Sequence, residues 1–93
     1  ILEMIQGYFE DLSFVLKELF RVTRTGGRLA LVVGNSCWAG VPVEVDRLLS
    51  EIAEIVGLRV DKIWITRYKL NSAQQIQRYG KVPLRESVVI LEK

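Results

Sequence analysis

The 93-residue chain carries 13 Lys and Arg against 11 Asp and Glu, with no histidine and one cysteine, and 49% of its residues are hydrophobic. This length allows one domain with a small core, and the cysteine and histidine counts exclude an internal disulfide framework and the usual zinc ligand set. No apolar run approaches the roughly 18 residues of a membrane span, so a cytoplasmic protein is expected.

An amphipathic helix is predicted near the start of the chain. Its apolar residues follow the i, i+4, i+7 and i+8 spacing of one buried stripe: Tyr8, Leu12, Val15, Leu16, Leu19 and Phe20. Gly26 or Gly27 is expected to supply the left-handed residue that ends this helix. The next segment, Leu29 to Val33, has no polar alternation, which is typical of a strand covered on both faces, as in a parallel sheet.

A second helix is predicted from Pro42 to Val56, because proline suits the first helical turn and Gly57 can close the last one. A strand follows over Leu58 to Tyr68, with a bulge near Asp61 and Lys62 where the alternation slips.

The rest of the chain is predicted to be a polar, basic loop from Leu70 to Arg85, with a helical turn at Ala73 to Arg78, and a last strand from Ser87 to Leu91. The elements indicate an α/β fold with about three strands and two main helices, which form one partial domain over residues 1–93. If consecutive strands are parallel, right-handed crossovers place both helices on one face and leave the other face of Leu29 to Val33 bare.

Charge is concentrated in the C-terminal part of the chain. Residues 59–85 contain seven Lys and Arg and one acidic residue, a net charge of +6, whereas residues 1–58 carry −3. Aromatic and amide side chains are interleaved with these cations, a mixture suited to phosphate contact, base stacking and hydrogen bonding to base edges. The alternative is a solvated loop whose arginines pair with neighbouring carboxylates.

The sequence resembles a known enzyme family in two places. A helix followed by RVTRTGGRLALVVG resembles the C-terminal half of class I S-adenosylmethionine-dependent methyltransferases, with a doubly wound, Rossmann-like sheet. The segment Arg78 to Ser87, RYGKVPLRES, followed by Val88 to Leu91, resembles prokaryotic DNA (N4-cytosine or N6-adenine) or RNA amino-methylases. The resemblance covers about Tyr8 to Lys93, and the chain is expected to be part of a longer protein.

The resemblance implies a nucleic-acid substrate, DNA rather than RNA, and S-adenosylmethionine as the cofactor of the full-length enzyme. Two features of the family are missing from these residues: a glycine-rich turn after a first strand and a D-P-P-Y or N-P-P-Y tetrapeptide. No residue is therefore assigned to catalysis or cofactor binding, and this chain alone is expected neither to bind the cofactor nor to catalyse the reaction. The missing half would cover the bare sheet face and pair with the free strand edge.

Candidate substrate contacts come from the basic segment: Arg67, Tyr68, Gln74, Gln75, Arg78, Tyr79, Lys81 and Arg85. Tyr79 is the leading candidate for stacking on an extruded base, and its alternative role is to anchor the loop. Arg85 has an alternative as well, which is simple pairing with Glu86 or with the sheet edge.

Asn35 and Ser36 are predicted to form one wall of a substrate pocket, because ligands of open α/β sheets bind at the carboxyl ends of strands. A turn-forming Asn-Ser pair would look the same in sequence. Cys37 lacks a histidine base for nucleophilic chemistry, and Trp38 is expected to cover apolar surface. The rival to the enzyme interpretation is a binding or assembly module without catalysis, and a homodimer is expected if the bare face is not covered by the missing half.

Overall fold

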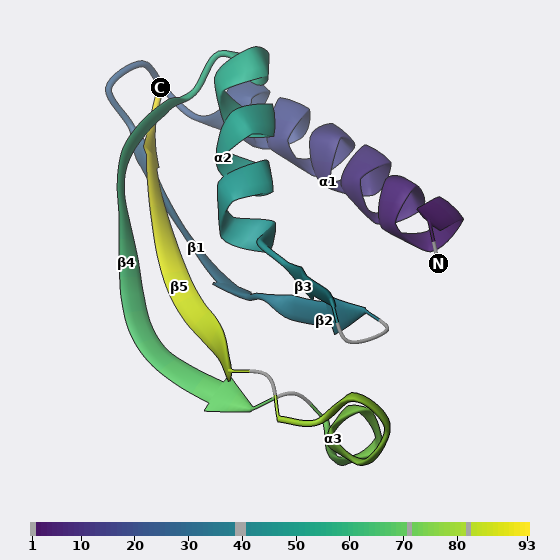
Figure 1. Ribbon diagram of the computed structural model, residues 1–93. Coiled ribbons are helices and arrows are strands. Elements are labelled where there is room, and N and C mark those ends of the chain that lie inside the picture. The colour runs from purple at the N-terminus through teal and green to yellow at the C-terminus, as the bar shows by residue number, and fades with distance from the viewer. Residues whose placement is uncertain (1, 39–40, 71, 82) are drawn as a thin grey trace.

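The computed structural model describes residues 2–38, 41–70, 72–81 and 83–93, apart from the side chains of residues 2, 38, 41 and 75. Two long helices lie on one side of a strongly curved sheet (Figure 1). The elements in chain order are α1 (Leu2–Val22), β1 (Arg28–Gly34), β2 (Ser36–Trp38), β3 (Val41–Val43), α2 (Val45–Val56), β4 (Arg59–Leu70), α3 (Ala73–Tyr79) and β5 (Pro83–Glu92).

The main sheet has the order β1-β5-β4, and both of its pairings are antiparallel. β1 and β4 therefore run in the same direction, joined by the α2 crossover, with β5 inserted between them. The sequence predicted a parallel neighbouring strand for Leu29 to Val33. This prediction was wrong, because the strand that pairs with β1 among the described residues is the antiparallel β5. The reason is that the last strand returns directly from β4 through α3 and so must enter the sheet in the opposite direction.

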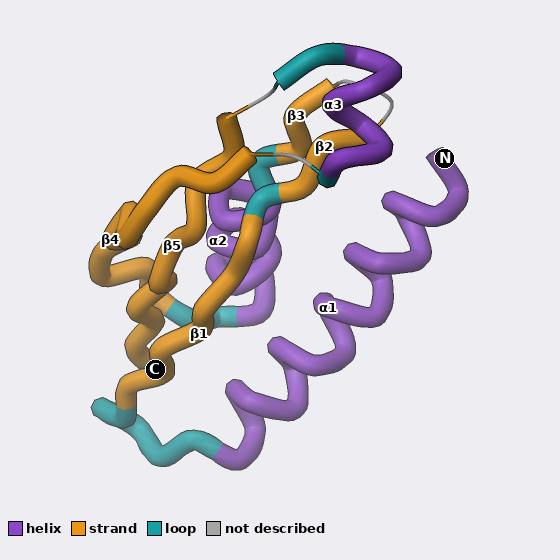
Figure 2. Tube along the Cα trace, turned by 90° about the horizontal axis from the view of Figure 1, so that it is seen from below, coloured by secondary structure: helices purple, strands orange, loops and turns teal. Residues whose placement is uncertain are grey.

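The core lies between the sheet and α2, with α1 packed against α2. Leu49 and Ala53 of α2 meet Leu16 of α1 and the buried residues Val89 and Leu91 of β5. Both helices lie on the same side of the sheet in two perpendicular views, as predicted (Figures 1 and 2). Alternation along β1 directs Leu29, Leu31 and Val33 toward this core and leaves Ala30 and Val32 exposed on the other face.

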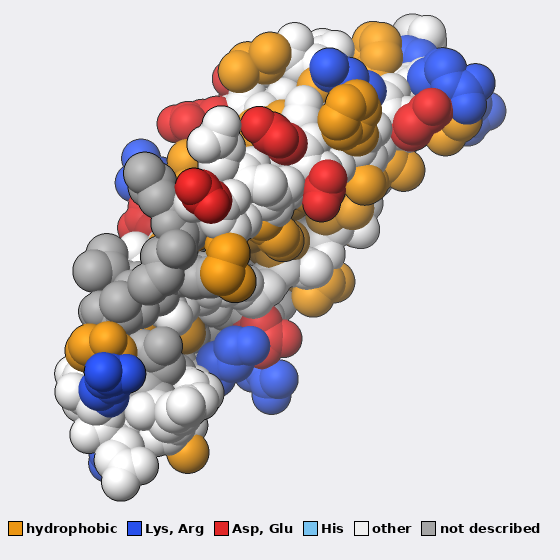
Figure 3. Space-filling model, turned by 90° about the vertical axis from the view of Figure 1, so that its right-hand side faces the viewer, with side chains coloured by type: hydrophobic (Ala, Val, Ile, Leu, Met, Phe, Trp, Pro, Cys, Tyr) orange, Lys and Arg blue, Asp and Glu red, His pale blue; other side chains and the backbone are white. Residues whose placement is uncertain are grey.

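The predicted first helix is present, but the stripe assigned to it is only partly covered. Leu16 is fully buried, whereas Tyr8 and Val15 are about half exposed. Hydrophobic side chains are visible on the helical side of the molecule, among acidic ones (Figure 3). The helix also ends earlier than predicted, at Val22, so Gly26, whose φ is +83°, belongs to the following turn and not to the helix end.

The second helix begins at Val45, three residues after the predicted start at Pro42. Pro42 instead lies in β3, where it pairs with Cys37 in a two-stranded antiparallel sheet. A short strand with one neighbour tolerates proline at an edge position, and the flanking valines favour extended backbone. Cys37 itself lies in β2.

The bulge predicted near Asp61 and Lys62 is confirmed in β4. The register of β4 against β5 shifts between Val60 and Lys62, and it shifts again between Ile65 and Arg67. The predicted helical turn is also confirmed as α3. β4 and β5 both extend further than predicted, to Leu70 and from Pro83, because the pairing continues through Lys69 with Leu84 and Leu70 with Pro83.

Candidate nucleic-acid interface

The basic arm, defined as residues 67–81, projects from the end of the sheet. It comprises the last residues of β4 and the helix α3, and it lies beyond the same end of the sheet as the β2–β3 hairpin (Figure 1). Tyr68 and Tyr79 are 65% and 45% exposed, and the described Gln74, Arg78 and Lys81 are exposed as well. Aromatic and cationic groups are thus displayed together on a protruding segment.

The charges of the arm differ in how they are paired. Arg67 donates from Nε to Oε2 of Glu86 over 2.8 Å, and this hydrogen bond holds the pKa of the Glu86 carboxyl below its usual value. The Arg78 guanidinium lies 6.0 Å from the centre of the Tyr79 ring. Among the described residues, neither Arg78 nor Lys81 forms an ion pair, so both cations are available to an anionic partner.

A second polar cluster lies at the carboxyl end of β1, and we call it the polar junction: Asn35, Glu44, Asp46, Arg85 and Ser87. At its centre Asp46, in the first turn of α2, is only 1% exposed. Arg85 donates from Nε to Oδ2 of Asp46 over 2.8 Å and from Nη2 to Oδ1 over 2.9 Å. Ser87 donates from Oγ to the same Oδ2 over 2.8 Å.

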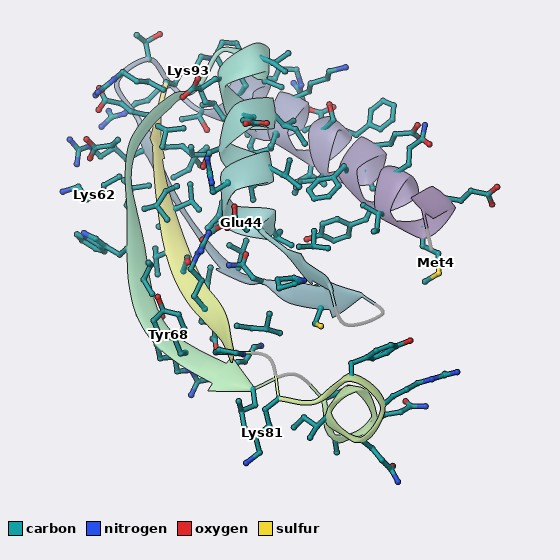
Figure 4. All side chains as sticks on the ribbon, in the orientation of Figure 1. Met4, Glu44, Lys62, Tyr68, Lys81 and Lys93 are labelled. Carbon is teal, nitrogen blue, oxygen red and sulfur yellow. The ribbon has the colours of Figure 1, made fainter. Side chains whose placement is uncertain are left out.

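Electrostatics in the polar junction favour a charged pair. Burial of Asp46 acts to raise the pKa of its carboxyl, but hydrogen bonds from Arg85, Ser87 and the Arg47 backbone N–H outweigh burial and lower that pKa to about 2. The hydrogen bond to Asp46 in turn raises the pKa of Arg85. Glu44, at the base of α2 (Figure 4), adds a longer contact of 3.6 Å between its Oε1 and Nη1 of Arg85.

Asn35 joins the polar junction to the strand before it. Its side-chain Oδ1 accepts a hydrogen bond from the Asp46 N–H over 3.1 Å, and its own N–H donates to the Arg85 carbonyl over 3.1 Å. The helix N-cap, Glu44, makes no side-chain cap bond, so Asn35 supplies the oxygen that an N-cap side chain would provide. Asn35 is itself only 6% exposed.

The predicted site residues therefore fall into separate groups. Arg67, Tyr68, Gln74, Arg78, Tyr79 and Lys81 lie on the arm, whereas Asn35 and Arg85 lie in the polar junction; the Gln75 side chain is outside the described residues, as are Asn71 and the Trp38 side chain. Ser36 is half-buried and lines an apolar hollow with Ile5, Tyr8, Phe9, Val43 and Val45.

Sequence reasoning missed the central residue of the polar junction. Asp46 is not among the site residues predicted from the sequence. A signal was nevertheless present, because Asp46 and Ser50 are spaced i, i+4 and alternate with Leu49 and Ala53, which places both polar residues on the buried side of α2. A buried acid of this kind needs a cationic partner.

Other kinds of site find no support. Within the described residues, no group of three or more His, Cys, Asp and Glu is placed to hold a metal ion, and every buried side-chain nitrogen or oxygen has a hydrogen-bond partner. None of the described helices has the length and apolarity needed to cross a membrane.

Comparison with known proteins identifies relatives along the whole chain. Type II methyltransferase M.BsoBI of Geobacillus stearothermophilus is 44% identical over 94 residues, which cover 100% of this chain and 18% of that protein. Type II methyltransferases M.AvaI of Nostoc sp. and of Anabaena variabilis are each 41% identical over 91 residues, or 97% of this chain and 19% of those proteins. The resemblance to a methyltransferase segment is confirmed, and the chain spans about a fifth of the length of these relatives.

No protein-family model and no solved structure matches the chain.

Proposed function

We propose that this chain is the C-terminal part of a DNA methyltransferase and supplies part of the substrate-recognition region of that enzyme. The observation that carries this proposal is the identity of 41% to 44% with type II methyltransferases along essentially the whole chain. The proposed reaction of the full-length protein transfers a methyl group from S-adenosylmethionine to an exocyclic amino group of a base. DNA is preferred to RNA as the substrate, and a cytoplasmic location follows from the proposed function.

The cofactor is proposed to bind outside these residues. The described segment offers no glycine-rich turn and no uncommitted buried acid, because the Asp46 carboxylate is already held by Arg85 and Ser87. S-Adenosylmethionine would supply the electrophilic methyl group, and the residues of this chain would orient the DNA that carries the nucleophile. No step of the proposal requires a cofactor contact from this chain.

The basic arm is the proposed DNA contact. Arg78 and Lys81, which form no ion pair with the described residues, suit phosphate oxygens, and the exposed Tyr68 and Tyr79 suit unstacked bases. The proposed contacts on the arm are those predicted from the sequence: Arg67, Tyr68, Gln74, Gln75, Arg78, Tyr79 and Lys81. Arg85, predicted with them, lies in the polar junction, where its Nε and Nη2 bind Asp46. Asn35 and Ser36 remain the proposed wall of a substrate pocket.

The doubly wound architecture is proposed for the full-length protein. β1 is an edge strand of the described sheet, and Val32, 72% exposed, points away from the helices. Lys62 of β4 also lies on the side of the sheet away from the helices (Figure 4), where its Nζ is 5.1 Å from the centre of the Trp64 ring. A further strand along β1 and a second helical layer on this face would remove both the free edge and the exposed apolar side chains.

Salt dependence of DNA binding tests the proposed interface. In the full-length protein, replacing Arg78 and Lys81 by alanine should lower the slope of log K against log salt concentration by roughly one to two units, because fewer counterions are released. Replacing Arg21 and Arg24, which lie outside the arm, is the matched control and should leave the slope unchanged. An unchanged slope for the arm variant would place the DNA contact elsewhere.

A second candidate function, assembly without catalysis, is favoured by the exposed apolar face of the sheet. In this case the 93-residue chain would form a symmetric dimer through β1 or through the sheet face, burying on the order of 1,200 Å² or more. Val32→Asp should then give a folded monomer by light scattering, whereas Leu31→Asp, which points to the core, should unfold the chain. A monodisperse wild-type monomer at high micromolar concentration would contradict this candidate function.

A further inference from the structure

The polar junction links the base of the basic arm to the packed body. Arg85 lies two residues after the start of β5, where the chain returns from the arm, and it is paired in register with Tyr68 on β4. The same residue holds Asp46 of α2 by two hydrogen bonds and accepts one from the Asn35 N–H at the end of β1. Three elements are therefore tied together where the arm begins.

The ion pair at the other end of the same strand pair is more exposed. There Arg59 donates to Glu92 over 2.6 Å, and the Arg59 side chain is 64% exposed. In the polar junction, by contrast, the Arg85 side chain is 23% exposed and that of its partner Asp46 is 1% exposed. Exposed ion pairs contribute little and tolerate loss, while a buried bidentate pair fixes both direction and distance. The Arg85–Asp46 pair is therefore suited to fix the position of β5 relative to α2.

From this arrangement we infer that Arg85 and Asp46 form a clamp that fixes the direction of the basic arm relative to the carboxyl end of β1. The inference rests on the proposed function, in which the arm contacts DNA. Arg85 is on this view a positioning residue: its Nε and Nη2 are committed to Asp46, and it acts on DNA through the placement of Tyr68 and the following arm residues. The proposed pocket wall at Asn35 and Ser36 is positioned relative to the arm by the hydrogen bonds that Asn35 makes with Arg85 and Asp46.

The test is a double-mutant cycle in the full-length protein, with affinity for a fluorescently labelled mixed-sequence DNA duplex measured across salt concentrations. Asp46→Asn and Arg85→Gln should each weaken binding about tenfold, since either change releases the arm. The double variant should be no weaker than either single one, because the two residues act as one unit. The salt slope should stay at the wild-type value in all three, and Arg59→Gln, which removes an equal charge from the same strand pair, should bind as the wild type does.

Two results would overturn the clamp while leaving the proposed function intact. Arg85→Gln could lower the salt slope by roughly one unit while Asp46→Asn leaves affinity unchanged, which would make Arg85 a direct phosphate contact. Alternatively, all clamp variants could bind as the wild type does while the Arg78 and Lys81 variant still shows its lower slope. Failure of the wild-type protein to bind DNA would instead reject the proposed function itself.

Loss of folding is controlled by circular dichroism and by a milder variant. Ser87→Ala removes one hydrogen bond from Asp46 but leaves both charges in place, and it should weaken binding about threefold with the fold intact. If Asp46→Asn unfolds the protein and Ser87→Ala binds DNA as tightly as the wild type, the polar junction serves stability alone and the clamp is rejected.

Discussion

The packed body and the basic arm share β4 but are stabilised differently. In the body, Leu58, which directly precedes β4, and Val89 and Leu91 of β5 are buried against the helices. In the arm, every described residue except Ile76 is exposed, and the contacts that Arg67 makes with Glu86 and Arg78 with Tyr79 lie at the surface. The body therefore obtains its stability from apolar burial, while the arm has surface available for a partner and little to lose when that surface is changed.

Truncation of a core leucine should give the largest effect and the sharpest contrast between the two regions. Leu49→Ala should destabilise the chain by about 2 to 5 kcal/mol, since it removes a fully buried side chain from the contact between α2 and the sheet. Urea denaturation measures this free energy of unfolding. Tyr68→Ala in the arm and Ile55→Ala, which is 84% exposed on the same helix as Leu49, should each change it by less than about 0.5 kcal/mol. A comparable loss in either control would remove the distinction between body and arm.

The pH dependence of stability should give the next largest effect, because it reports on the polar junction, which lies at the base of the arm. The folded-state pKa of Asp46, about 2, lies below the value of 3.8 expected without the contacts, so the charged pair stabilises the fold above about pH 4. This stabilisation should amount to about 2 to 3 kcal/mol and should be lost progressively as the pH falls from about 4 toward 2.

Asp46→Asn is the control for this pH dependence. The variant should be less stable than the wild type at pH 7, and the difference between them should shrink below pH 4, as followed by urea denaturation at several pH values. Equal loss of stability in both proteins between pH 4 and pH 2 would assign the acid sensitivity to other carboxylates.

The body was largely predictable from sequence, because periodic burial leaves a pattern that can be read locally. The stripe on α2, the apolar run of β1, the bulge in β4 and the common face of the two helices all follow from residue spacing and handedness. The placement of β5 between β1 and β4 was not predicted, since strand order depends on pairing between segments distant in sequence. The start of α2 was also missed, because proline is compatible with both a first helical turn and an edge strand.

The site was predictable only as a list of residues. Net charge and aromatic content identified the arm, and these properties are visible without coordinates. The sequence does not distinguish the role of Arg85 from that of Arg78. In the structure the Arg85 guanidinium binds the buried Asp46 carboxylate, whereas Arg78 is exposed. This difference arises because β5 packs against the first turn of α2. A contact between segments so distant in sequence leaves no local sequence pattern.

The smallest expected effect is confined to one ring of the arm and distinguishes its two proposed roles. Tyr79→Ala should weaken binding of single-stranded DNA by about 1 to 3 kcal/mol in the full-length protein, as expected for the loss of one stacked base. The salt slope should change little, because the ring carries no charge and Arg78 beside it is retained. Fluorescence anisotropy with single-stranded and duplex oligonucleotides measures both quantities, and Tyr79→Phe, which keeps the ring, should bind as the wild type does. Equal losses for single-stranded and duplex DNA would indicate that Tyr79 anchors the arm and does not stack on a base.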